Sequence, residues 1–96
     1  MKIVKIGAMW CPACIVTNKF WKEIKDDFSD IEFVDLDIDM DDEESNKYGN
    51  LDILPVVVFE EKNKELKRII GEHKKDEYEN TIKELLKWKH LKELVY

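Results

Sequence analysis

Two cysteines separated by two residues are the part of this sequence best suited to chemistry. The chain contains only Cys11 and Cys14, with Pro12 and Ala13 between them. A disulfide between such close residues closes too small a loop to stabilise a fold much, so a purely structural bridge is a weak explanation. In a reducing compartment, such a pair is more often a redox motif or half of a metal site.

A helix that begins at the cysteines would give the two thiols different tasks. Apolar residues recur about every four positions through residues 12–28, which predicts a helix, and Pro12 suits its first turn. The apolar stripe of this helix comprises Ile15, Val16, Phe20, Trp21, Ile24 and Phe28. Unpaired N–H groups and the dipole at the first turn favour a thiolate at Cys11, the predicted attacking thiol. Cys14 lies about one turn further on the same side, where it can resolve a mixed disulfide on Cys11.

Strands and further helices are predicted around this turn. β-Branched and alternating apolar residues indicate strands at residues 2–7, 31–38, 55–59 and 66–70. Residues 41–48 begin with a run of acidic side chains, which predicts a short helix that stops at Gly49. The last two strands form a hairpin across residues 61–65. A helix from residue 75 onward closes the chain, with an apolar stripe of Tyr78, Ile82, Leu85, Trp88, Leu91 and Val95.

This order of elements, βαβαββα, predicts an α/β fold. A strand, a crossover helix and a second strand imply a parallel, right-handed pair, while the terminal hairpin is antiparallel. A mixed four-stranded sheet flanked by three helices follows. The chain of 96 residues is long enough for one layered core and too short for two, so residues 1–96 are expected to form one domain.

Charge and composition exclude several function classes. Acidic residues outnumber basic ones 22 to 16, giving a net charge of −6, whereas nucleic-acid binding needs clustered positive charge. The segment MKIVKIG at the start reads as a strand and not as a signal peptide or membrane span. We therefore expect a cytoplasmic protein that binds neither nucleic acid nor membrane, and we expect a monomer.

Three patterns invite a metal site, and none of them is sufficient. Aspartates alternate at positions 35, 37, 39 and 41, but Met40 stands where a calcium loop of the EF-hand type needs glycine. His73 and His90 lie far from the cysteines in sequence and have no ligand spacing with them. A zinc site would need a second cysteine pair from another chain. No metal and no cofactor is predicted.

Several motifs together resemble the thioredoxin family. The segment AMWCPAC at residues 8–14, between a strand and a helix, resembles the active-site turn of that family. Leu54 and Pro55 resemble its cis-proline motif, and Gly71 resembles the glycine that borders its substrate groove. The resemblance spans nearly the whole chain, but the extra strand and helix with which thioredoxins usually begin are missing, leaving a core closer in size to glutaredoxins. It implies a thioredoxin-like sheet in the order second, first, third, fourth strand.

The resemblance implies a thiol–disulfide oxidoreductase that reduces protein disulfides, receives electrons from a reductase and needs no bound cofactor. Trp10 is expected to border the sulfur of Cys11, and the Leu54 backbone to pair with an extended substrate segment. An exposed apolar patch around Trp10, Leu54 and Gly71 is expected to form the partner surface. Two alternatives stay open: a glutaredoxin-like enzyme that uses glutathione, and a thioredoxin-fold binding module whose cysteines bind metal or have no redox task.

One departure from the family concerns a charge pair. Thioredoxins commonly carry a buried acid in the first core strand behind the resolving cysteine and a lysine in the neighbouring strand. The matching positions here are Lys5 and Asp35, so the pair is reversed. The two charges can still meet and compensate each other across adjacent strands. Alternatively, Lys5 extends to solvent and Asp35 lies on an uncovered part of its strand.

Overall fold

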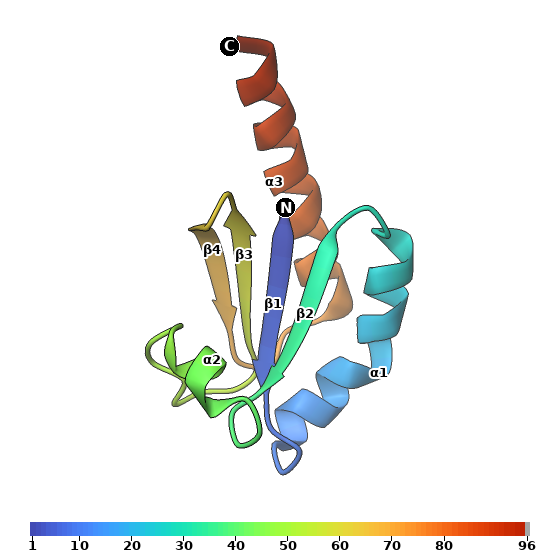
Figure 1. Cartoon of the computed structure of the whole chain (residues 1–96). Helices are drawn as coiled ribbons and strands as arrows, with labels where there is room; N and C mark the ends of the chain where they lie inside the picture. The colour runs from blue at the N-terminus through green and yellow to red at the C-terminus, as the bar shows by residue number, and fades with distance from the viewer. Residues whose placement is uncertain (96) are drawn as a thin grey trace.

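The arrangement of strands and helices agrees with the predicted topology. The computed structural model describes the backbone of residues 1–95 and the side chains of residues 1–91. In chain order its elements are β1 (Lys2–Gly7), α1 (Pro12–Asp27), β2 (Glu32–Asp37), α2 (Asp42–Asn46), β3 (Val56–Glu61), β4 (Lys64–Ile70) and α3 (Lys75–Val95). The sheet order is β2-β1-β3-β4, with β1 parallel to β2 and the other pairs antiparallel (Figure 1). The predicted α/β class, element order and sheet order are confirmed.

Alternation along the strands divides the core between the two faces of the sheet. Ile3 of β1 contributes to the cluster under α1 and α3, while Val4 and Ile6 contribute to a cluster on the opposite face. The first cluster also contains Trp21, Ile24, Ile31, Val57, Phe59, Ile69, Tyr78 and Ile82. The second also contains Ala8, Cys11, Cys14, Leu54, Val56 and Val58. Because both cysteines belong to a core cluster, the backbone around them is anchored.

One end of the sheet collects the segments that carry the predicted site. β1 and β2 end there at Gly7 and Asp37, which are register partners. β3 starts there at Val56, and β4 ends there at Ile70, its partner. The turn before α1, the loop before β3 and the loop after β4 consequently meet at this end of the sheet (Figure 1).

The first turns of α1 bury a different set of residues from the predicted stripe. The buried residues of the helix are Cys14, Thr17, Trp21 and Ile24, whereas Ile15 and Val16 are exposed. The inward face is fixed by Cys14, and helical periodicity then places residues three, seven and ten positions later on the same face. The prediction of Ile15 and Val16 as core residues is therefore wrong.

The hairpin between β3 and β4 is tighter than predicted. The strands pair as far as Glu61 and Lys64, so the turn consists of Lys62 and Asn63 and not of residues 61–65. Both turn residues have positive φ, 52° and 66°, as a two-residue hairpin turn requires. Asparagine often adopts this conformation but lysine does not, so the sequence signalled only half of the turn.

The last helix is buried only along its first turns. Tyr78 and Ile82 are fully buried, but Trp88 and Leu91 are 46% and 52% exposed. Figure 1 shows α3 extending past the strands at the end of the sheet opposite the β1–α1 turn. The predicted core position of Trp88 is therefore wrong, and Val95 lies outside the described side chains. Within the described part of the chain, no helix is long and apolar enough to cross a membrane.

Candidate active site

Cys11 is the residue that caps the N-terminus of α1. Its backbone is extended, with φ −88° and ψ 113°, and the helix begins at Pro12. The backbone N–H of Cys14 donates a hydrogen bond to Cys11 Sγ at 3.2 Å. A side chain in this position accepts from N–H groups that the helix cannot pair, and those donors favour negative charge on the sulfur. The geometry therefore supports Cys11 as the attacking thiol.

Cys14 lies one turn along α1 with its sulfur turned into the core. Both cysteines are free thiols, and only 6% of Cys11 and 4% of Cys14 is exposed. Burial raises the pKa of the Cys14 thiol to about 11; the Cys11 sulfur adds to the rise, and Lys5 opposes it. Cys14 is consequently protonated at neutral pH. The two cysteines are about equally covered but have different electrostatic surroundings.

A glycine makes room for the Cys14 sulfur. A Cβ atom on Gly7 would lie 3.1 Å from Cys14 Sγ. Non-bonded heavy atoms are comfortable at about 3.5–4.0 Å, so the end of β1 approaches α1 more closely than a side chain would allow. Sequence reasoning gave Gly7 no part in the site, because this contact depends on how α1 crosses the end of β1.

The loop before β3 lies against the Cys11 sulfur. The Leu54–Pro55 peptide bond is cis, as the resemblance implied. Cys11 Sγ donates a weak hydrogen bond to the Leu54 carbonyl oxygen at 3.8 Å, and Pro55 lines a cavity together with Cys14. Gly71, at φ 85°, donates its N–H to the Pro55 carbonyl oxygen at 2.8 Å. The structure thus brings the cysteines, Pro55 and Gly71 together.

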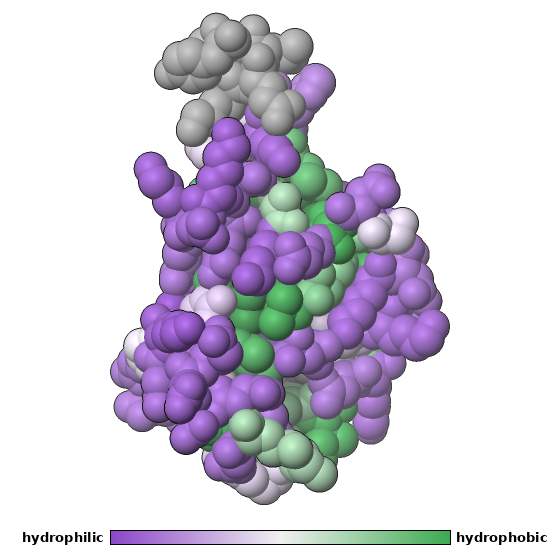
Figure 2. All heavy atoms as spheres, viewed as in Figure 1, coloured by the Kyte–Doolittle hydropathy of each residue, from purple (hydrophilic) through white to green (hydrophobic). Residues whose placement is uncertain are grey.

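The exposed apolar surface around the site differs from the predicted patch. Leu54 is only 9% exposed and Gly71 is buried, so their inclusion in that patch is wrong. The Leu54 side chain packs into the cluster that contains the cysteines. Ile53, which precedes Leu54, is 62% exposed, and Met9 and Trp10, which precede Cys11, are also exposed. Figure 2 shows apolar residues reaching the surface at the end of the molecule where the β1–α1 turn lies.

Trp10 is held by a hydrogen bond that the sequence did not indicate. Its indole N–H donates to Asp39 Oδ2 at 2.8 Å. Asp39 lies in the turn after β2, where Asp37 Oδ1 accepts from the backbone N–H groups of Asp39 and Met40 at 2.8 and 3.2 Å. These aspartates therefore shape the turn and position the indole ring. Among the described residues, no group of three or more histidines, cysteines and acids could hold a metal ion.

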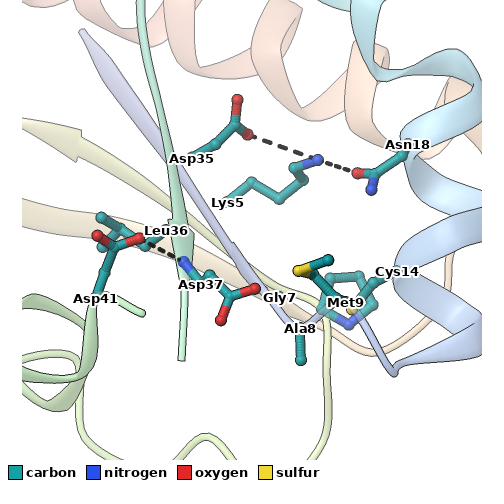
Figure 3. Close-up of a pocket in the computed structure, with 11 residues that line it drawn as sticks. Lys5, Gly7, Ala8, Met9, Cys14, Asn18, Asp35, Leu36, Asp37 and Asp41 are labelled. Atoms are coloured by element: carbon teal, nitrogen blue, oxygen red, sulfur yellow. Dashed lines mark hydrogen bonds and ion pairs between the residues drawn. The ribbon is translucent and has the colours of Figure 1, made fainter. Parts of the chain in front are cut away.

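A cluster of charges lies behind Cys14 (Figure 3). Lys5 and Asp35 are register partners on β1 and β2 and form an ion pair at 3.5 Å. Lys5 also donates to Asn18 Oδ1, and its ammonium group lies 5.3 Å from the centre of the Trp21 ring. The Lys5 side chain is 12% exposed, whereas Asp35 remains partly exposed at 44%. The two charges meet, so the alternative of a Lys5 side chain extended into solvent is wrong.

The sequence and the fold both have relatives among known proteins. The sequence profile of the family Thioredoxin matches residues 1–84. Thioredoxin H2 of Arabidopsis thaliana is 34% identical over 83 residues, which cover 86% of this chain and 61% of that protein. Thioredoxin of Mycoplasma genitalium is 36% identical over 69 residues, which cover 72% of this chain and 67% of that protein. Thioredoxin 1 of Thermosipho africanus shares the fold, with a TM-score of 0.78 at 23% identity over 94% of this chain and 99% of that one.

Proposed function

The chain belongs to the thioredoxin family of thiol–disulfide oxidoreductases, and from this we propose that it reduces disulfide bonds in other proteins. Cys11 attacks the substrate disulfide, and Cys14 resolves the mixed disulfide that forms. The observation that carries this proposal is the placement of Cys11 Sγ at the N-cap of α1, where it accepts a hydrogen bond from the Cys14 N–H at 3.2 Å. The second thiol lies within one helical turn.

The reaction proceeds through two exchanges of sulfur. In the first, the Cys11 thiolate forms a bond to one sulfur of the substrate disulfide, and the other sulfur leaves as a thiolate that takes a proton from water. In the second, the Cys14 thiolate bonds to Cys11 Sγ, and the remaining substrate sulfur leaves in the same way. The substrate gains two electrons, and the protein is left with a Cys11–Cys14 disulfide.

An extended substrate segment fits against the loop before β3. The Leu54 carbonyl oxygen lies 3.8 Å from Cys11 Sγ, so a segment paired with the Leu54 backbone would bring its disulfide to the attacking sulfur. Exposed Met9, Trp10 and Ile53 offer apolar area beside this position. We expect these side chains to contact the residues that flank a substrate disulfide.

Each turnover must be followed by a reaction that returns two electrons to the Cys11–Cys14 disulfide. We propose that a separate reductase supplies them, because a Cys11–Cys14 disulfide is reduced again only by electrons from outside the pair. We also propose that the chain acts as a monomer. Both thiols, the Leu54 carbonyl oxygen and the apolar surface come from one chain, so the site is complete without a second copy.

Reduction of insulin disulfides in the presence of dithiothreitol tests the proposed function. The wild type should accelerate precipitation of the reduced insulin chains, and Cys11→Ser should abolish the acceleration. Cys14→Ser should instead accumulate a mixed disulfide with the substrate, visible by mass spectrometry without reductant. Activity retained by Cys11→Ser would contradict the assignment. Zinc in the purified protein with resistance to oxidation would favour a binding module, and dependence on glutathione would favour a glutaredoxin-like enzyme.

The reduction potential of the cysteine pair separates reduction from oxidation as its cellular task. Equilibration with glutathione buffers should give a potential near about −270 mV for a reductant of the thioredoxin type. A potential of about −180 to −120 mV would indicate an oxidant or isomerase and would contradict the proposed direction of electron flow. Tryptophan fluorescence reports the transition, because Trp10 is adjacent to Cys11.

A further inference from the structure

We propose that Lys5 is a positioning residue for the second exchange, in which its ammonium group stabilises the thiolate of Cys14 across the cavity beneath α1. The inference rests on the proposed function, because Cys14 must lose its proton before it can attack Cys11. A thiol this buried is a poor nucleophile unless a positive charge lies close to it. The second exchange therefore depends on what surrounds Cys14.

Lys5 and Cys14 face the same cavity. Lys5 lies two residues before Gly7 on β1, so both project towards α1, and Gly7 is the residue against which the Cys14 sulfur rests. Lys5, Gly7 and Cys14 line one open cavity of about 220 Å³. Figure 3 shows the Lys5 side chain crossing this space between β2 and α1. The cavity also gives the Cys14 thiol a route by which its proton can reach water.

Three groups hold the Lys5 ammonium in place. It donates to Asn18 Oδ1, which lies one turn after Cys14 on α1. It pairs with Asp35 at 3.5 Å and lies 5.3 Å from the centre of the Trp21 ring. With only 12% of its side chain exposed, Lys5 is a fixed charge and not a mobile surface group.

Among the described residues that line the cavity, Lys5 is the one cation, and the carboxylates of Asp35, Asp37 and Asp41 lie there too. Asp35 is the carboxylate paired with Lys5, but Lys25 of α1 also forms an ion pair with it, so two ammonium groups share one carboxylate. Two further acids of the β2–α2 region line the cavity, and both are engaged by backbone donors. Asp37 Oδ1 accepts from two N–H groups of its own turn, and Asp41 Oδ2 accepts from the Asp37 N–H at 2.9 Å.

The electrostatic effects on both partners agree with this geometry. The Lys5 charge lowers the pKa of Cys14, against the larger rise that burial causes. Burial also lowers the pKa of Lys5, and the Asp35 carboxylate raises it in turn. In the proposed step the Cys14 proton goes to water through the cavity, the Cys14 thiolate forms a bond to Cys11 Sγ, and the bond from Cys11 to the substrate sulfur breaks. Lys5 keeps its proton throughout.

The first test measures Cys14 ionisation without requiring catalysis. In a Cys11→Ser background Cys14 is the only thiol, and serine is a good N-cap residue. Lys5→Met should lower the alkylation rate of Cys14 by iodoacetamide about threefold at fixed pH, because a pKa raised by one unit lowers the thiolate fraction about tenfold while the more basic thiolate is about threefold more nucleophilic. Lys5→Arg should retain most of the rate. Lys25→Met is the matched control, because it removes a partner of the same Asp35 without lining the cavity, and it should change the rate much less.

The second test measures the resolving step in the protein with both cysteines. A mixed disulfide of Cys11 with a small aromatic thiol should release that thiol about threefold more slowly in Lys5→Met. The reduction potential at neutral pH should stay unchanged, because Cys14 is a neutral thiol there in the reduced protein. Lys5→Gln repeats both measurements if Lys5→Met does not fold.

The two tests separate failure of this inference from failure of the proposed function. Equal alkylation and release rates in wild type and Lys5→Met would overturn the role of Lys5 even if insulin reduction is normal. A wild type that never resolves a mixed disulfide would overturn the proposed function, and the alkylation rates would then still decide whether Lys5 acts on Cys14. Equal losses in Lys5→Met and Lys25→Met would show a general structural effect and would also overturn the inference.

Discussion

Replacement of Gly7 by alanine should slow the resolving thiol while leaving the attacking thiol unaffected. The added Cβ would lie 3.1 Å from Cys14 Sγ, whereas contact between heavy atoms is comfortable at about 3.5–4.0 Å. The sulfur must therefore move by about 0.5 Å. A displacement of about 1 Å at a reacting group can cost 100-fold in rate, so about half that displacement should slow the second exchange about tenfold.

The effect of Gly7→Ala on stability should be smaller than its effect on rate. Overpacking a core costs about 1–3 kcal/mol, but a glycine replaced by alanine within a strand recovers about 0.5–1 kcal/mol of backbone entropy. Because Cys14 is one small side chain at the rim of the core, we expect a net loss of about 1 kcal/mol in the free energy of unfolding. The folded population would then remain nearly complete.

Single-turnover kinetics with a disulfide-linked reporter would measure both exchanges in Gly7→Ala. The mixed disulfide should form at the wild-type rate and disappear about tenfold more slowly. The matched control is Cys14→Ser with and without Gly7→Ala, in which Cys11 should attack at the same rate, because both variants keep the backbone N–H of residue 14 that donates to the Cys11 sulfur. Resolution at the wild-type rate in Gly7→Ala would refute the argument that this glycine sets the position of the Cys14 sulfur.

Three further predictions concern binding, pH dependence and the core. Ile53→Lys should raise KM for insulin about tenfold without changing turnover of a small aromatic disulfide. Leu91→Lys places the same charge at another exposed apolar position, on α3 away from the cysteines, and should change neither. The hydrogen bond to Glu77 raises the pKa of His73, so the stability lost in His73→Gln should be greatest below the unfolded-state pKa of about 6.5 and should vanish as the pH rises through the folded-state pKa. Because both side chains are partly exposed, the loss should be at most about 1 kcal/mol. Urea unfolding at several pH values measures it, and a difference that does not change with pH would contradict the argument. Phe59→Ala removes a fully buried ring and should lower the free energy of unfolding by about 3–5 kcal/mol, with the urea slope unchanged.

The residues with strong local signals were predictable from the sequence. The turn between β1 and α1 could be predicted almost completely, because helix N-termini obey short-range rules. Its cysteines are separated by two residues, and Pro12 stands at the start of the apolar helical stripe. The sheet order is the one that the family resemblance implied, and the right-handed crossover and the hairpin are consistent with it. Asn18 was also within reach of such reasoning, since a residue four positions after Cys14 shares its face of α1.

The residues that depend on packing were not predictable. Leu54 and Ile53 are both apolar and both precede Pro55, and nothing in their order says that Leu54 is buried and Ile53 exposed. The same holds for Gly7, whose role follows from the close approach of α1 to the end of β1. Contacts between segments distant in sequence decide which of these residues is buried, and the periodicity within one segment carries no information about such contacts.

The different tasks that we propose for the two cysteines follow from the direction in which each sulfur points and not from the exposure of the side chains. Both thiols are almost fully covered, so access alone would make them equivalent. Cys11 precedes the helix and turns its sulfur towards the unpaired N–H of Cys14, whereas Cys14 lies within the helix and turns its sulfur towards the sheet. The environment of Cys11 offers hydrogen-bond donors to a thiolate, whereas the environment of Cys14 excludes water from the sulfur and raises the pKa of the thiol. A buried resolving thiol is kept from attacking the substrate directly. Its thiolate must then be stabilised by a neighbouring group when it attacks Cys11. In this chain, Lys5 is the cation that the fold places on that side of the cavity.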